Sequence, residues 1–191
     1  MSRSVTDTPP GLPTPAESSA LCLRCGLCCD GTLFFSVGLK PDEVESAERN
    51  GLSPRPSDSG DEFRQPCPCL DGTACRIYRE RPASCRRFRC ELLKSVETGD
   101  QSVGDAQAII AEARRLREVA DRFCTAGEDR ARARIGWYDQ LQATRAGHRP
   151  TRPAMMLAMT ALNHFLDLHF RRSDKRLLNA SKIGPTPGER R

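Results

Sequence analysis

The sequence contains no hydrophobic run long enough to cross a membrane, because no apolar stretch approaches the roughly 18 residues that a spanning helix needs. It also lacks the apolar segment of a secretory signal, since residues 1–19 are rich in proline, serine and threonine. These absences predict a cytoplasmic protein with no membrane partner. In that compartment thiols stay reduced, so clustered cysteines are expected to bind metal or to react rather than to form disulfides.

Aromatic residues make up only 5% of the chain, and apolar residues as a whole make up 38%. Since this core is lean, something besides hydrophobic burial is expected to help hold the first half together. Lysine is scarce as well, because four of the 30 basic residues are lysine and the rest are arginine. The basic residues are interleaved with 25 acidic ones, which excludes a continuous phosphate-tracking stripe, so nucleic acid is not an expected partner.

Cysteine, by contrast, is abundant: the chain has ten, and nine of them lie between positions 22 and 90. The first cluster reads Cys22-x2-Cys25-x2-Cys28-Cys29, and a two-residue spacing lets thiolates turn toward one point, as in zinc knuckles and iron–sulfur loops. Neighbours in an extended backbone project to opposite sides. Cys28 and Cys29 therefore indicate two centres, a multinuclear cluster, or one ligand beside a reactive thiol.

The second cluster consists of Cys67, Cys69, Cys75, Cys85 and Cys90. On an ideal helix Cys85 and Cys90 would lie about 140° apart, so either the helix begins after Cys85 or the two serve different centres. Cys124 lies on an apolar helical stripe and is interpreted as a small buried hydrophobe.

The hydrophobic pattern predicts an α+β fold that is mostly α, with a small metal-stabilised, cysteine-rich N-terminal half followed by a bundle of about three helices. We divide the chain into a disordered N-terminal segment (1–19), a cysteine-cluster metal-binding domain (20–97), a helical region (98–172) and a flexible basic tail (173–191).

Within the cysteine-rich domain, short strands are expected over 33–39 and 74–78, and helices over 41–50 and within 83–96. Residues 53–65 are expected to form a surface loop because they contain two prolines and a Ser-Asp-Ser-Gly run. In the second half, apolar residues at spacings of three and four predict helices over 103–124, 131–146 and 151–172.

Three stretches of the cysteine-rich domain together resemble a known family. They are CLRCGLCCDGTLF (22–34), CPCL (67–70) and CRIYRERPASCRRFRC (75–90). This pattern is similar to the CxxCxxCC zinc- or iron-chelating domain of bacterial YkgJ-type cysteine-cluster proteins, over about residues 20–95. The resemblance implies a cofactor of zinc or iron, including an iron–sulfur cluster.

The family pattern has a residue other than cysteine where Cys69 stands. The resemblance therefore implies eight metal ligands, namely Cys22, Cys25, Cys28, Cys29, Cys67, Cys75, Cys85 and Cys90. Eight is the number that two four-cysteine sites require, and Cys69 is then a spare thiol or an alternative ligand.

Other residues near the cluster have simpler interpretations. Asp30 precedes Gly31 and is expected to form a turn. Arg81 and Arg86 are either partners that steady thiolate charge by hydrogen bonding or exposed, solvated arginines. Tyr78 and Phe88 are expected to shield the centre. Metal ligation is not expected from His148, His164 or His169, and Met155, Met156 and Met159 are interpreted as core residues.

Three functions remain open from the sequence. The first is a metal-binding protein with cysteine-ligated zinc or iron–sulfur centres in a structural or binding role, in which the C-terminal helices could dock a protein partner. The second is an iron–sulfur redox or methyl-transfer enzyme, by analogy with larger relatives, and the third is metal storage or delivery. No nucleophile–base pair, phosphate loop or carboxylate pair stands out, so the catalytic residues, if any, are unknown and catalysis rests on analogy alone.

Overall fold

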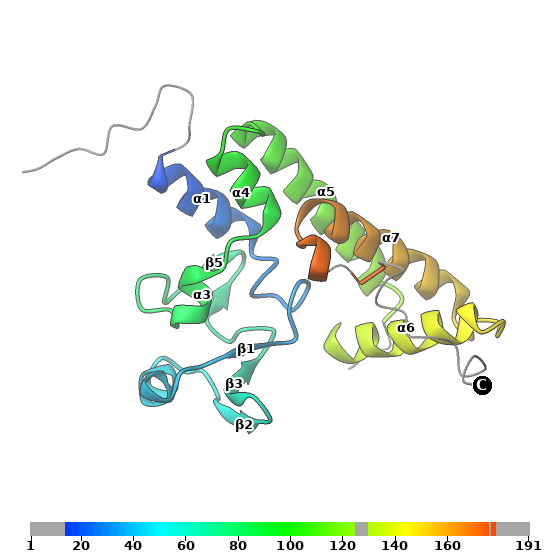
Figure 1. Ribbon diagram of the computed structural model, residues 1–191, viewed down its shortest axis with the longest axis horizontal. Coiled ribbons are helices and arrows are strands. Elements are labelled where there is room, and N and C mark those ends of the chain that lie inside the picture. The colour runs from blue at the N-terminus through cyan, green and yellow to red at the C-terminus, as the bar shows by residue number, and fades with distance from the viewer. Residues whose placement is uncertain (1–13, 125–129, 176, 179–191) are drawn as a thin grey trace, which may run out of the picture.

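A computed structural model describes residues 14–124, 130–175 and 177–178. The fold is mostly helical with small antiparallel sheets, as the sequence predicts. Helices α1, α4 and α5 pack together at one end, α6 and α7 extend away at the other, and the strands and α3 occupy the remaining side (Figure 1). Within the described residues, no helix is both long and apolar enough to cross a membrane.

The first element is helix α1 (Pro15–Cys25), which the sequence analysis did not predict. Thr14 caps it: the Thr14 hydroxyl accepts from the Glu17 backbone N–H, and the Glu17 carboxylate accepts from the Thr14 N–H. The predicted disorder over 1–19 is therefore wrong for 15–19, while residues 1–13 lie outside the described part of the chain. Helix α1 ends at Gly26, whose φ of 70° is left-handed.

The strands form two small antiparallel sheets. One has the order β1-β3-β2, from Ser36–Gly38, Gly60–Arg64 and Arg55–Ser57, and the other pairs β4 (Leu70–Asp71) with β5 (Ala74–Cys75). The prediction of a surface loop over 53–65 is thus wrong, because β2 and β3 form a hairpin that also pairs with β1. The predicted helix over 41–50 is present as η1 (Pro41–Glu43) and α2 (Val44–Arg49).

The remaining helices follow the predicted order. The segment 83–96 contains two short helices, α3 (Ala83–Arg87) and α4 (Glu91–Glu97), with a break between them. The three predicted long helices are α5 (Val103–Asp121), α6 (Arg130–Arg145) and α7 (Pro153–His169), and a short 3-10 turn, η2 (Ser173–Lys175), follows. Their ends differ from the expected ones by a few residues.

Two hydrophobic cores hold the molecule. The main core joins buried residues of α1, α4, α5, α6 and α7, and the predicted core residues Met155, Met156 and Met159 belong to it. The second, smaller core lies beside the three-stranded sheet and comprises Leu39, Ala47, Leu52, Phe63 and Cys69. Because the main core takes residues from both sides of position 97, the cysteine-rich half and the helical half share it; the division into domains stays a prediction.

The chain after α7 is anchored to that helix. The Asp167 carboxylate accepts hydrogen bonds from the Leu177 and Leu178 backbone N–H groups, and it pairs with Arg171 at 2.8 Å. Residues 173–175 and 177–178 of the predicted flexible tail are thus described, and Leu177 and Leu178 contact α7 and the main core. Residues 176 and 179–191 lie outside the described part, and the flexibility of the tail stays a prediction.

Candidate metal centre

Eight cysteines from distant parts of the chain line one cavity of about 720 Å³. They are the same eight that the family pattern implies as ligands: Cys22, Cys25, Cys28, Cys29, Cys67, Cys75, Cys85 and Cys90. Neither Cys69 nor Cys124 lines this cavity, and none of the ten cysteines forms a disulfide. The fold therefore brings together the predicted ligands and leaves the other two cysteines outside.

Four of the eight, the first set, lie against the main core: Cys22, Cys25, Cys28 and Cys90. Cys22 and Cys25 are three residues apart on the last turn of α1 and so share one face of that helix. Cys28 follows in the turn after Gly26. Cys90 is the N-cap of α4, and its sulfur accepts from the Leu93 N–H at 3.4 Å. Since α1 packs on α4, these thiols face the same space.

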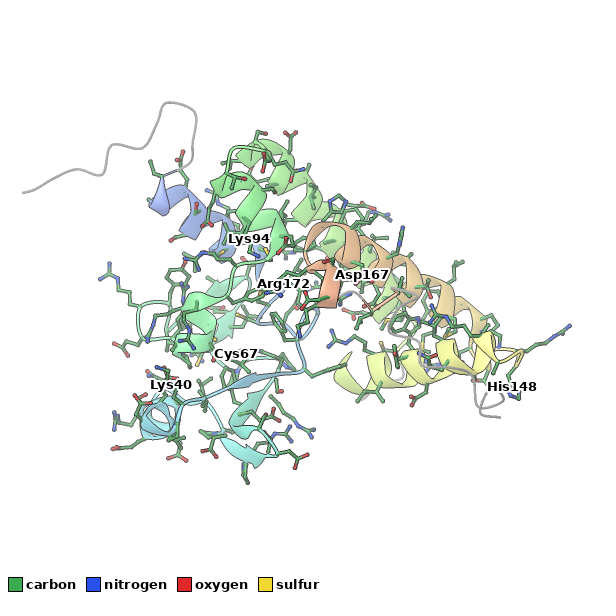
Figure 2. The ribbon with its side chains drawn as sticks, viewed as in Figure 1. Lys40, Cys67, Lys94, His148, Asp167 and Arg172 are labelled. Carbon is green, nitrogen blue, oxygen red and sulfur yellow. The ribbon has the colours of Figure 1, made fainter. Side chains whose placement is uncertain are left out.

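The other four, the second set, lie on the side of the sheets: Cys29, Cys67, Cys75 and Cys85. The Cys67 N–H donates to the Cys29 carbonyl oxygen at 2.7 Å, which ties the two cysteine clusters of the sequence together. Cys75 lies in β5 and Cys85 in α3, and Cys67 and Cys85 pack against the second core. Figure 2 shows Cys67 on this side of the molecule, far from His148 at the distal end of α6.

The electrostatic interactions among the thiols of the first set support this grouping. Burial is the largest cause that raises the Cys28 pKa, and charges on Cys90 and Cys25 raise it further. Burial is also the largest cause that raises the Cys25 pKa. The hydrogen bond from the Leu27 N–H lowers this pKa, and the charges on Cys90 and Cys22 raise it. The charge on Cys29 of the second set also raises the Cys28 pKa, as expected for neighbours in the sequence.

The second set shows the same kind of mutual interaction. After burial, the Cys29 pKa is raised most by Cys75 and Cys85, and the Cys85 pKa by Cys67 and Cys75. The charge on Cys69, which lies outside the cavity, also raises the pKa of Cys67 and of Cys75. The break between α3 and α4 thus allows Cys85 and Cys90 to belong to different sets, which is one of the two arrangements that their spacing allows.

With no metal bound, these thiols strongly favour their protonated form. Burial is the main cause, and it raises the pKa to about 12 for Cys25, Cys29 and Cys67 and to about 11 for Cys85 and Cys90. Because a metal binds the thiolate, loading must release protons and becomes easier as the pH rises.

A family model described as "CxxCxxCC: Putative zinc- or iron-chelating domain" matches residues 21–124, which is more than half of the chain. The protein belongs to this family. The match extends beyond the predicted span of 20–95 and takes in α5, in accordance with the packing of α5 against α1 and α4. No curated protein and no solved structure matches the chain.

The donor set suits what the CxxCxxCC family is described as chelating, because thiolates bind both zinc and iron–sulfur clusters. In the described part of the chain, however, no three or more His, Cys, Asp or Glu side chains are gathered tightly enough to hold a single ion. The eight thiols line one cavity together with residues of other types.

Several neighbouring residues have roles outside the cavity. Asp30 forms the expected turn, since its carboxylate accepts from the Thr32 N–H at 2.8 Å, and it also pairs with Arg117 at 2.7 Å. Arg86 is exposed, lies near Glu43 and does not line the cavity, so of its two interpretations the structure agrees with the exposed arginine and not with a partner of the thiolates. The Cys69 thiol is buried and donates to the Asn50 carbonyl oxygen.

Gly26 allows α1 to approach the turn that leads to Cys75. A Cβ on residue 26 would lie 3.1 Å from the Thr73 Cα and 3.2 Å from the Thr73 carbonyl oxygen. We expect Gly26→Ala to lower both metal content and thermal stability, because alanine in a left-handed conformation costs about 1–2 kcal/mol even before Thr73 must shift. Thermal unfolding and metal analysis of the purified variant measure the two effects.

Gly51→Ala is the matched control, because Gly51 has a φ of 81° and a Cβ on this residue would meet no atom within 4 Å. Gly51→Ala should lose only the stability that the strained backbone of residue 51 costs, and it should keep the metal content of the wild type. Equal losses in the two variants would show that the close approach at Gly26 has no part in assembling the cavity.

Proposed function

We propose that this CxxCxxCC domain binds two iron–sulfur clusters, one at the first set and one at the second. The observation that carries the proposal is the convergence of eight cysteines on one cavity. Cys22, Cys25, Cys28 and Cys90 pack against the main core, whereas Cys67 and Cys85 of the second set pack against the smaller one. Four cysteines are the usual ligands of both [2Fe–2S] and [4Fe–4S] clusters. Cys28 and Cys29 are then adjacent ligands of two neighbouring centres.

The volume of the cavity favours clusters over single zinc ions. A zinc ion needs four sulfurs about 2.3 Å from one point, and the space it fills is smaller than the roughly 30 Å³ of one water molecule. The cavity that the thiols help to line holds about 720 Å³. It has room for two polynuclear clusters, and its walls would have to close in further around two single zinc ions than around two clusters.

The chain's own residues bind the clusters and exclude water from them. The cavity wall is largely apolar, and it includes Phe34, whose ring meets that of the more exposed Phe88 edge to face at 4.7 Å. An apolar wall is one of the protein's means of setting a cluster's reduction potential. When bound, a cluster supplies one-electron redox chemistry and cross-links the segments that carry its ligands. A docking role for the C-terminal helices and a cytoplasmic location remain predictions.

Purification without oxygen tests the proposal. We expect a brown protein with broad visible absorption and with iron and acid-labile sulfide in equal amounts. The double variant C25S/C85S, which interrupts both sets, should lose this absorption. C69S should keep it, since Cys69 lies outside the cavity. A colourless wild-type protein with stoichiometric zinc would exclude iron–sulfur clusters, and rapid exchange of that metal with a chelator would favour storage or delivery.

A further inference from the structure

Arg81 is a half-buried cation in the wall of the cysteine cavity. Its guanidinium carbon lies 3.6 Å from the centre of the Tyr78 ring, and both residues line the cavity. This stacking fixes the plane of the guanidinium. The Arg81 Nε is buried and makes no hydrogen bond among the described residues. Since a buried N–H without an acceptor is costly, this atom indicates a ligand that the cavity is built to receive.

No ion pair joins Arg81 to an acidic side chain within the described residues, unlike the other arginine that lines the cavity. Arg89, the other arginine of the cavity wall, lies 3.3 Å from Glu97, and Arg86 lies 3.8 Å from Glu43. The negative charge nearest to such a guanidinium is then free to come from a bound group in the cavity. Four thiolates around a metal centre carry such a charge.

The charge of Arg81 acts on thiols of both sets. It opposes burial and lowers the pKa of Cys22 in the first set, and it does the same for Cys29, Cys75 and Cys85 in the second. Among the same thiols Arg89 lowers the pKa of Cys22 alone, and Glu97 opposes that effect. These directions accord with the position of Arg81, which lines the same cavity as the cysteines of both sets.

We propose that Arg81 is the common counter-ion of the two metal centres, with its Nε–H donating to a ligand or cluster sulfur. This inference rests on the proposed function, since it requires metal at both sets. A cation favours the more negative, reduced form of a centre and holds thiolates together. One residue would thus set both the metal retention and the reduction potentials of two centres, making Arg81 a positioning residue for both.

The substitution Arg81→Gln tests this, with R81K to keep the charge and R86Q as the matched surface control. In R81Q we expect metal loss to a chelator to be about tenfold faster from both sets. The reduction potentials of both centres should fall by about 59 mV, which is a tenfold change for a one-electron couple. R81K should retain metal better than R81Q, and R86Q should behave as the wild type.

The backgrounds C28S and C29S isolate the sets, because each should leave one centre intact. The inference is overturned if R81Q changes metal loss and reduction potential in only one of these two backgrounds, or if R81Q leaves the reduction potentials unchanged. Either result would leave the proposed function standing. If the wild-type protein holds no metal, both fail together.

Discussion

Cys28→Ser and Cys29→Ser should each remove about half of the bound metal, and from different centres. Although these residues are adjacent, Cys28 interacts with Cys25 and Cys90, whereas Cys29 interacts with Cys75 and Cys85. Serine is a poor ligand for these soft metals, so a set of three thiolates should lose its centre. Metal analysis per chain gives the stoichiometry, and the spectra of the two remaining centres should differ because their surroundings differ.

The double variant C28S/C29S should then hold almost no metal, and C124S should hold as much as the wild type. Cys124 provides the control because it is half-buried and lies outside the cavity. Two outcomes contradict the division into sets. Loss of all metal from either single variant would indicate one joint centre, and unchanged metal in either would remove that cysteine from the ligands.

A division into two sets is one of the alternatives that local geometry leaves open. Neighbours in an extended backbone diverge, so Cys28 and Cys29 indicate two centres, a multinuclear cluster, or one ligand beside a reactive thiol. The separation of Cys85 and Cys90 on a regular helix is too wide for one ion, so it indicates different centres or a helix that begins after Cys85. Which cysteine joins which set depends on the packing of α1 against α4 and on the Cys67–Cys29 backbone hydrogen bond, and no sequence pattern contains these contacts.

Two errors in the local structure have different causes. Helix α1 had a readable signal in Thr14 and Glu17, whose spacing is that of a capping box, but the proline-rich context led to a prediction of disorder. The β2–β3 hairpin had no such signal. Within β3 only Phe63 is buried, and the strand is held by pairing on both sides, so the alternation that marks a strand is absent.

The choice between Arg81 and Arg86 shows a further limit of sequence reasoning. Both flank Cys85 closely, and both qualify equally as partners of thiolates. Their difference arises from tertiary contacts, because Tyr78 holds one guanidinium in the cavity wall and Glu43 lies near the other outside it.

Raising the pH from 7 to 10 should destabilise the metal-free protein. The folded-state pKa is about 12 for Cys25 and about 11 for Cys90, and that of Cys28 is also well above the ordinary thiol value of 9.0. Above pH 9 the unfolded chain therefore loses protons that the folded chain keeps, and stability falls with pH until the folded pKa is passed. At pH 10 Cys25 and Cys90 each cost about 1.4 kcal/mol, or about 3 kcal/mol for the two, and Cys28 adds to the loss in the same direction.

That loss is a large fraction of the roughly 5–15 kcal/mol that stabilises a typical domain. Denaturant unfolding of the metal-free, fully reduced protein at several pH values measures it. C28S supplies the control, because serine does not titrate in this pH range. The slope of stability against pH should be shallower in C28S than in the wild type, since the other titrating groups contribute equally to both proteins. The metal-loaded protein should show the opposite trend, losing metal and stability as acid reprotonates the thiolates. If the metal-free protein is equally stable at pH 7 and pH 10, these thiols are not buried together in the protonated form.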